Sequence, residues 1–285
     1  MRYSAPHSID EAVGALLAAK GAGRILAGGT DLLVQMKAGV ARPGAIVDVK
    51  NIAEMTSIEE KGGVFRIGAA VSGARIGEHA ALKKAWPGVV EAINLIGSKQ
   101  IQGRASPGGN LCNASPAADS VPALIAAGAI VAVHGSKGRR EVPVEQIQIG
   151  PGRTSLEPGE IVVSFTLPAR PKGSSDAYLR LIPRTEMDIA VVGCGVSLTM
   201  KDGVCTAARV GLGAVAPTVM LVEAAGAALV GSKLDADALE KAAAACRAVC
   251  KPINDKRGTI VYRTKIAGVL LKRVVAIAAE RAGGR

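Results

Sequence analysis

Aromatic residues are scarce in this chain. Phe, Tyr and Trp together make up 2% of its 285 residues. Proteins that bind single-stranded nucleic acids usually stack the bases on aromatic side chains, so this scarcity argues against that function. Hydrophobic residues nevertheless reach 49%, which is typical of a folded globular protein. The core must therefore be built mainly from Ala, Val, Leu and Ile.

Long apolar runs are also missing. The longest, VPALIAAGAIVAV at 121–133, is shorter than the ~20 residues that a transmembrane helix needs. The first residues, MRYSAPHSIDEAV, contain no apolar signal core. We therefore expect no membrane span and a cytoplasmic protein.

Cysteine and histidine are too scattered to suggest a reactive cluster. The cysteines are odd in number and irregularly spaced, as in reduced cytosolic thiols: Cys112, Cys194, Cys205, Cys246 and Cys250. Cys246 and Cys250 lie one helical turn apart, but a zinc or iron–sulfur site would need further ligands nearby. The histidines are isolated, and no acid–base dyad or nucleophile triad is recognisable: His7, His79 and His134. We predict no metal site and no catalytic residue of this chain's own.

The charge that is present has one dominant sign. The formal net charge is +11, which suits nucleic acid, an anionic membrane, an acidic partner protein or a phosphate-bearing ligand. The densest basic stretches, KGRR at 137–140 and NDKRG at 254–258, are short. We interpret the charge mainly as solubility and steering of partners, with nucleic-acid binding as the weaker alternative.

Hydrophobic periodicity predicts an α+β protein with three units, at residues 1–55, 56–170 and 176–285. The first unit alternates helix and strand, beginning with a capping box formed by Ser8 and Glu11. The second mixes helices near 74–84, 87–96 and 121–127 with antiparallel strands. The segment at 168–175, PARPKGSS, is the best linker candidate. The third unit is a small sheet followed by a helical bundle, whose apolar faces include residues 239–250 and 266–277.

Two pairs of adjacent glycines are the most informative motifs. AGGTD at 27–31 stands directly before a predicted helix, and SPGGN at 106–110 is a second turn of the same kind. Glycines let backbone N–H groups converge on an anion, so two such turns suggest a diphosphate held from both sides. Hydrogen bonds to a charged acceptor contribute about 1.5–3 kcal/mol each, so four or five amides would account for most of a micromolar affinity. The alternative is that both pairs are ordinary structural turns.

Asp119 closes the second glycine stretch, SPGGNLCNASPAAD, in which most side chains are small. A carboxylate there would suit a sugar hydroxyl or an adenine amine at the far end of the same ligand. A third glycine motif, GLGAVA at 211–216, matches the dinucleotide fingerprint. No strand ending in Asp or Glu follows it at the expected distance, so a structural turn is the better interpretation.

LAGGTDLLVQMKAG and IQGRASPGGNLCNASPAADSVPALIAAGA together closely resemble the FAD-binding medium subunit of the molybdenum hydroxylases. This family includes aerobic carbon monoxide dehydrogenase and xanthine dehydrogenase. FRIGAAVSGARI, GLGAVAPTVMLVEAAGAAL and DKRGTIVYRTKIAGVLLKRVV extend the resemblance over nearly the whole chain. It implies a fold of the vanillyl-alcohol-oxidase (PCMH) type, with FAD between two N-terminal α/β subdomains and a C-terminal domain closing over the flavin.

The resemblance also assigns residues. Ala27, Gly28, Gly29, Thr30 and Asp31 match the first diphosphate loop of the family, and Ser106, Gly108, Gly109 and Asn110 match the second. Asp119 matches an acidic residue that contacts FAD, and the segment TEMDIAVV, with Asp188 and Ile189, matches one near the isoalloxazine ring. Three positions depart from the family pattern: Pro107 replaces Ile, QGR replaces RNR, and Ile189 replaces the Tyr of some relatives.

The function implied by the resemblance is electron transfer. Such a subunit takes electrons from the [2Fe–2S] clusters of a small subunit, after a large molybdopterin subunit has oxidised the substrate, and passes them from FAD to a quinone, NAD or O₂. The assembly implied is an (αβγ)₂ heterohexamer. Two alternatives stay open: a free-standing flavin oxidase or reductase, and a basic nucleotide-binding module without redox function.

Overall fold

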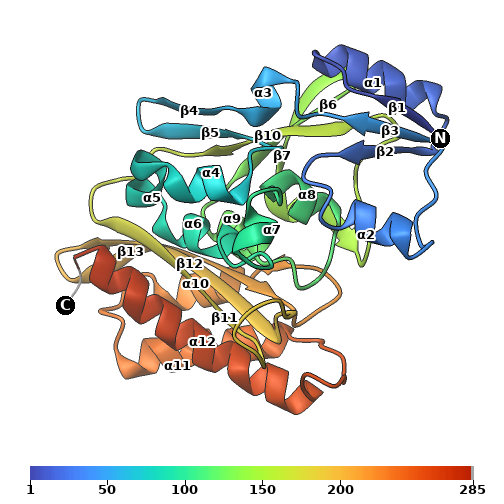
Figure 1. Ribbon diagram of the computed structural model, residues 1–285. Helices are drawn as coiled ribbons and strands as arrows, with labels where there is room; N and C mark the ends of the chain where they lie inside the picture. Colours follow the sequence, from blue (N-terminus) through green and yellow to red (C-terminus); the bar gives the residue numbers. More distant parts are fainter. Residues whose placement is uncertain (284–285) are drawn as a thin grey trace.

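The computed structural model describes residues 1–283 (Figure 1). Its N-terminal unit is a three-stranded parallel sheet in the order β1-β3-β2. Ser8 accepts a hydrogen bond from the Glu11 N–H and so begins the first helix. The elements of this unit are β1 (Arg2–Ser4), α1 (Ile9–Ala18), β2 (Gly23–Leu26), α2 (Leu32–Lys37) and β3 (Ala45–Asp48).

The middle unit is built on a five-stranded antiparallel sheet in the order β4-β5-β10-β6-β7. Its central strand is buried along nearly its whole length, as expected for a strand covered on both faces. The strands are β4 (Ile58–Lys61), β5 (Val64–Gly68), β6 (Ile130–Gly135), β7 (Gly138–Pro143) and β10 (Ile161–Leu167). The 3-10 helix η1 (Val144–Gln146) and the ribbon β8 (Gln148–Gly150) with β9 (Arg153–Thr154) follow β7.

A layer of short helices lies between the middle sheet and the C-terminal sheet (Figure 1). Helix α9 packs on both β12 and β13, and α6 packs on β11. The helices of the middle unit are α3 (Ala53–Thr56), α4 (Gly73–Glu78), α5 (Ala80–Ala85), α6 (Pro87–Ile93), α7 (Lys99–Gln102), α8 (Pro107–Cys112) and α9 (Ser120–Ala126).

The C-terminal unit is a four-stranded antiparallel sheet with one layer of helices on the face opposite α9. Its longest helix carries several Arg and Lys residues, and no helix within residues 1–283 is both long and apolar enough to cross a membrane. The elements are β11 (Ser174–Leu181), β12 (Val192–Lys201), β13 (Val204–Gly213), β14 (Met220–Leu221), α10 (Glu223–Leu229), α11 (Ala236–Val249) and α12 (Ile260–Arg281).

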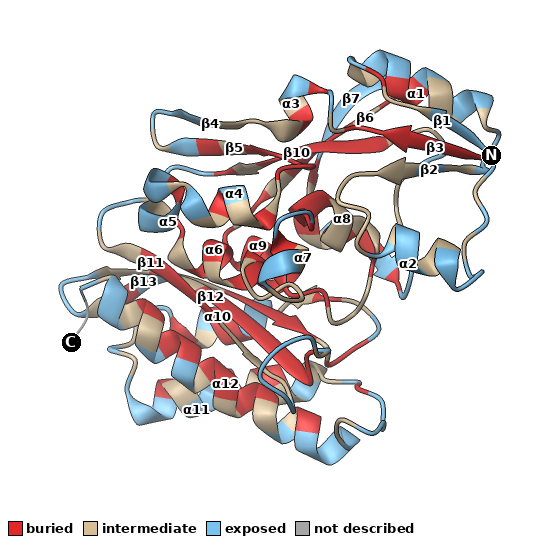
Figure 2. Cartoon of the chain, viewed as in Figure 1, coloured by how far each residue is buried: buried red, intermediate tan, exposed pale blue. Residues whose placement is uncertain are grey.

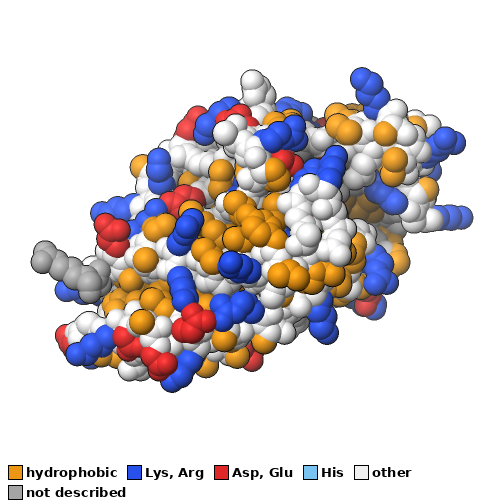
Figure 3. Space-filling view, turned by 90° about the horizontal axis from the view of Figure 1, so that it is seen from below, with side chains coloured by type: hydrophobic (Ala, Val, Ile, Leu, Met, Phe, Trp, Pro, Cys, Tyr) orange, Lys and Arg blue, Asp and Glu red, His pale blue; other side chains and the backbone are white. Residues whose placement is uncertain are grey.

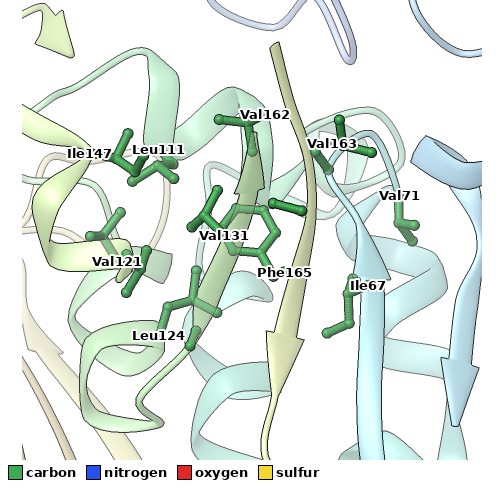
Figure 4. Packing of buried hydrophobic residues seen from close by; sticks show 14 of the residues in the cluster. Ile67, Val71, Leu111, Val121, Leu124, Val131, Ile147, Val162, Val163 and Phe165 are labelled. Atoms are coloured by element: carbon green, nitrogen blue, oxygen red, sulfur yellow. The ribbon is translucent and has the colours of Figure 1, made fainter. Parts of the chain in front are cut away.

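The protein has two hydrophobic cores, one around the middle sheet and one between the C-terminal sheet and its helices (Figure 2). In the first, Phe165 of β10 lies among Val131, Leu124 and other aliphatic side chains (Figure 4). The second contains the buried residues Ala243 and Cys246 of α11 and Val274 of α12. Both cores are almost entirely aliphatic, as the composition required.

Several local predictions were wrong. The helix predicted at 74–84 is divided, because His79 ends α4 and caps α5 by accepting a hydrogen bond from the Leu82 N–H. SPGGN is not a strand-to-helix turn: Ser106 caps a helix, α8, that contains both glycines. Strand β11 begins at Ser174, inside the segment taken as a linker, because pairing with β12 extends that far.

Candidate functional site

The first glycine loop runs from the end of β2 to the start of α2. None of the backbone N–H groups of Gly28, Gly29, Thr30 and Asp31 donates a hydrogen bond to an acceptor within residues 1–283. Gly29 has φ +79°, a left-handed conformation that favours glycine. Asp31 occupies the N-cap of α2 without making a side-chain capping bond. Four consecutive amides at a helix start are therefore free to bind an anion.

The first glycine segment contacts the residues that lead directly into the second. A Cβ atom placed on Gly28 would lie 2.0 Å from the carbonyl oxygen of Arg104 and 3.0 Å from the backbone nitrogen of Ala105. Ala105 is followed at once by Ser106, the first residue of the second segment. The fold thus brings together, backbone against backbone, two motifs that are far apart in the sequence. Only glycine at position 28 allows this approach.

The second segment supplies fewer free amides than expected. The Gly108 N–H donates to the Ala69 carbonyl at 2.9 Å, and the Gly109 N–H donates to Ser106 Oγ at 3.1 Å. Pro107 lies at the first position of α8, where its missing N–H breaks no helical hydrogen bond. Because Ser106 and the chain itself already satisfy these donors, this structure places the free amides mainly in the first segment.

Gly109 differs from Gly108, because few atoms lie near the position that its Cβ would occupy. Its Cβ would approach only Ser106 Oγ, at 3.2 Å, and its φ is not positive. Gly108, by contrast, needs to lack a Cβ because Ala69 lies within 2.5 Å of that position. Apart from the close contact with the capping hydroxyl of Ser106, no atom of residues 1–283 beyond the neighbouring residues and the backbone of α8 lies within 4 Å of the position of the missing Gly109 Cβ. The backbone at Gly109 is therefore more open than that at Gly108.

Asn110 connects the glycine helix to the next helix. Its Oδ1 atom accepts hydrogen bonds from the backbone N–H of Ser120, at 3.1 Å, and from its hydroxyl, at 2.7 Å. This ties α8 to the start of α9, where Asp119 stands at the N-cap. The second glycine segment and Asp119 are therefore held as one rigid piece.

The Asp119 carboxylate is buried and faces the C-terminal sheet. One oxygen accepts from the Tyr178 hydroxyl at 3.1 Å, and the other accepts from Arg180 Nη1 at 2.7 Å. Burial raises the pKa of Asp119 to about 6, although the Arg180 guanidinium and the Tyr178 hydroxyl favour the ionised form. Both partners lie on β11 and were missed by the sequence analysis, because no local pattern marks a contact of this range.

Asp188 and Ile189 lie in the connection between β11 and β12. Asp188 accepts hydrogen bonds from Arg257 Nε at 2.9 Å, Arg184 Nε at 3.2 Å and the Ile189 N–H at 2.8 Å. The bond from Arg257, followed by those from Ile189 and Arg184, lowers the pKa of Asp188 to about 2, against the effect of partial burial. The Ile189 side chain is 53% exposed and points out of the C-terminal core.

The remaining reactive side chains form no second centre. No group of three or more His, Cys, Asp or Glu residues suited to a metal ion occurs within residues 1–283. Burial raises the pKa of the Cys112 and Cys246 thiols to about 12, so both side chains stay protonated. The GLGAVA segment leads into β14 rather than into a helix, which removes the helix N-terminus that a dinucleotide site needs.

The cavities and the surface charge do not point to another ligand. A hollow of about 250 Å³ is lined by Ile58, Arg75, Glu78 and His79, away from both glycine segments. On the face shown in Figure 3, Lys and Arg side chains are dispersed among acidic and hydrophobic ones. A continuous basic track, as a nucleic acid would require, is not seen on that face.

Comparison with known proteins places the chain in a family. The family described as "FAD binding domain in molybdopterin dehydrogenase" matches residues 1–170, and "CO dehydrogenase flavoprotein C-terminal domain" matches residues 177–278. The carbon monoxide dehydrogenase medium chain of Afipia carboxidovorans is 37% identical over 280 residues, covering 98% of this chain and 97% of that protein. The xanthine dehydrogenase FAD-binding subunit of Escherichia coli O157:H7 is 31% identical, covering 95% and 93%.

Solved structures also resemble this chain over nearly its whole length. A chain of the reconstituted CO dehydrogenase from Oligotropha carboxidovorans superimposes with a TM-score of 0.95 at 36% identity, covering 99% of this chain and 98% of that chain. A chain of quinoline 2-oxidoreductase from Pseudomonas putida 86 gives a TM-score of 0.89 at 29% identity, with the same coverage. The fold is therefore the expected FAD-binding domain followed by a C-terminal domain, and the cofactor is FAD. This chain belongs to the FAD-binding medium subunits of the molybdenum hydroxylases, a family of oxidoreductases.

Proposed function

We propose that this chain is the electron-transfer subunit of a molybdopterin-containing hydroxylase or dehydrogenase. It receives electrons from the [2Fe–2S] clusters of a small subunit and delivers them to an external acceptor, either a quinone, NAD or O₂. FAD, when bound, supplies the redox chemistry, and the protein supplies binding, orientation and tuning. The observation that carries the proposal is the contact of Gly28, which lies among the free amides of the first segment, with Arg104 and Ala105, which lead into the second.

Each predicted site residue has a place in this proposal. The backbone N–H groups from Ala27 to Asp31 bind the diphosphate. The second segment borders it, with Gly109 leaving room for the phosphates: Ser106, Gly108, Gly109 and Asn110. Asp119 can accept a further hydrogen bond from a sugar hydroxyl or an adenine amine, because each carboxylate oxygen has a second acceptor site. Asp188 and Ile189 border the isoalloxazine ring.

The partners in this proposal are a small [2Fe–2S] subunit and a large molybdopterin subunit, in a cytoplasmic (αβγ)₂ assembly. The relatives support the existence of partners, since they are named as medium chains or FAD-binding subunits of larger enzymes. The net charge of +11 suits steering toward acidic partner surfaces. Copurification of this chain with the two candidate subunits tests the assembly, and light scattering gives its stoichiometry.

FAD content is the direct test of the site. The chain is expressed with its candidate partners, purified and denatured, and any released cofactor is identified by chromatography. We expect FAD near one per chain. Gly109→Val should remove most of it, because the added methyl groups occupy the space left for the diphosphate. Gly14→Val is the control for adding the same side chain to a helical glycine away from the site, since Gly14 lies in α1 and has nothing within 4 Å of an added Cβ.

The alternatives give different results in the same experiment. Full FAD content in Gly109→Val would contradict the assignment of the second segment. Turnover of an electron donor by the isolated chain would favour a free-standing flavin oxidase or reductase. A colourless protein that stays colourless with partners and added FAD would favour a nucleotide-binding module, whose affinity should fall steeply with salt.

A further inference from the structure

Arg263 of α12 is a buried cation that the proposed function does not use. The residue is 4% exposed. Its Nη1 donates to the carbonyl oxygens of Val191, at 2.8 Å, and Ala214, at 3.3 Å, and its Nη2 donates to Asp255 Oδ1 at 2.7 Å. A buried guanidinium with three acceptors on three separate segments holds those segments in a fixed relation.

The contact of Arg263 with Asp255 is linked, through Arg257, to Asp188. Asp255 Oδ1 also accepts hydrogen bonds from the backbone N–H groups of Arg257, at 2.8 Å, and Gly258, at 3.1 Å. This fixes the turn that carries Arg257, whose Nε then donates to Asp188 Oδ1 at 2.9 Å. Two ion pairs, Arg263–Asp255 and Arg257–Asp188, are thus joined by a backbone hydrogen bond from Arg257 to Asp255, and we call these four residues the arginine clamp.

The other contacts of Arg263 lead back to the second glycine segment. Ala214, whose carbonyl binds Arg263, donates its own N–H to the carbonyl of Pro116 at 2.7 Å. Pro116 lies between Gly109 and Asp119 in the sequence. Val191, the second carbonyl partner, is two residues beyond Ile189. Arg263 is therefore linked to the stretch between Gly109 and Asp119 by two hydrogen bonds, one to Ala214 and one from Ala214 to Pro116. Through Arg263, this stretch is also connected to the segment around Asp188.

The segment that contains Met187, Asp188 and Ile189 has an uncommon backbone conformation and exposed apolar side chains. Met187 has φ +53°, a left-handed conformation that is unfavourable for a residue with a long side chain. Its side chain is 55% exposed, and that of Ile189 is 53% exposed. An unfavourable backbone conformation is kept only where contacts with the surrounding residues enforce it. The two exposed apolar side chains form a surface that a ligand or partner can cover.

We propose that Arg263 and Arg257 are positioning residues, which hold Met187 and Ile189 so that these side chains pack against the isoalloxazine ring of FAD. This inference rests on the proposed function, because it requires FAD bound at the two glycine segments. It adds a role for residues that do not contact the cofactor. The clamp fixes the orientation and solvent exposure of the ring, while the glycine segments determine the affinity.

The test uses the purified protein with FAD bound and the variant Arg257→Gln, which breaks the clamp at a partly exposed position. Collisional quenching of flavin fluorescence by iodide measures the exposure of the ring, and a redox titration gives its midpoint potential. We expect the quenching constant to rise by about twofold or more, since a segment released from its contacts opens locally. The midpoint potential should shift, and FAD affinity should change by less than about tenfold.

Two further variants keep the test decisive. Arg263→Lys retains the charge but offers fewer donors in a different geometry, and we expect it to change ring exposure in the same direction. Arg140→Gln is the matched control, because it breaks an ion pair with Glu160 on the middle sheet, and it should leave both readouts at the wild-type values.

The outcomes separate this inference from the proposed function. Wild-type protein without FAD would contradict the proposed function itself. Wild-type protein with FAD, together with unchanged quenching and potential in Arg257→Gln, would overturn only the clamp. Loss of FAD from Arg257→Gln with unchanged unfolding would also overturn it, because the clamp would then retain the cofactor rather than orient its ring.

Discussion

The charged residues of this protein act mainly across boundaries between elements. Asp119 at the start of α9 is the clearest example, since its partners Arg180 and Tyr178 both come from β11. The ion pair is almost fully buried, with side-chain exposures of 4% for Arg180 and 11% for Asp119. Replacing both charges by apolar groups can leave stability unchanged, but removing one leaves the other unpaired in the interior.

Arg180→Met should therefore destabilise the protein by about 3–5 kcal/mol at pH 7. Without the cation, the folded-state pKa of Asp119 lies still further above its unfolded value, so stability is greatest at acid pH and is lost as pH rises. We expect the loss to be smaller at pH 5 than at pH 7. Urea unfolding of variant and wild type at the two pH values measures it. Tyr178→Phe, which keeps the ring and both charges, is the control, and an equal loss at both pH values would contradict the explanation.

Helix α9 lies very close to the strands of the C-terminal sheet. A Cβ atom on Gly211 would lie 2.2 Å from the Pro122 carbonyl oxygen, and one on Gly195 would lie 2.7 Å from it. These glycines on β13 and β12 let the helix backbone rest directly on the strands. Both glycines of GLGAVA are thus explained by helix packing, since a Cβ on Gly213 would also lie 2.9 Å from Pro122.

Gly211→Ala should lower stability without weakening FAD affinity in the protein that remains folded. The added methyl group meets backbone atoms, so α9 must move away from the sheet, at a cost of about 1–3 kcal/mol. Thermal unfolding and FAD titration measure the two effects. Gly14→Ala on exposed α1 should instead stabilise by about 1 kcal/mol. A selective loss of FAD affinity in Gly211→Ala would revive the dinucleotide interpretation of this motif.

At the scale of the whole molecule, arginines join the two cores. Arg170 lies 4.1 Å from the centre of the Trp86 ring and pairs with Asp176 at 2.6 Å. Arg209 of β13 pairs with Glu145, and Arg281 of α12 pairs with Glu91 of α6. Each contact joins an element of the C-terminal unit, or the segment leading to it, to the middle unit. We expect these contacts to make the two units unfold together.

A ligand that binds only the folded chain should raise its unfolding temperature. FAD at 100-fold above its dissociation constant should stabilise by about 2.7 kcal/mol, in a single transition that includes both units. Riboflavin carries the same ring without phosphates, so it should give little of this effect. Calorimetry with each ligand makes the comparison. Equal stabilisation by riboflavin would show that the ring, and not the diphosphate, provides the binding energy.

The sequence by itself determined the local features of this protein. Ser8 marks the start of α1, and the apolar periodicity near Ala243 and Cys246 marks the buried face of α11. The glycine pairs at 28–29 and 108–109 marked the candidate site, because backbone approach depends on residue type. Capping and amphipathicity are set by neighbours within one or two turns, so they can be read without knowledge of the fold.

Only the tertiary structure decided which segments meet and which donors stay free. It placed Gly28 against Arg104, engaged the amide of Gly108 with the Ala69 carbonyl, and paired Asp119 with Arg180, a residue 61 positions away. It also placed Arg263 on the carbonyl of Val191, across 72 positions. Contacts of this range depend on how layers pack and on which polar groups are buried together. A single sequence carries no local signal for either, because they are set by the folded chain as a whole.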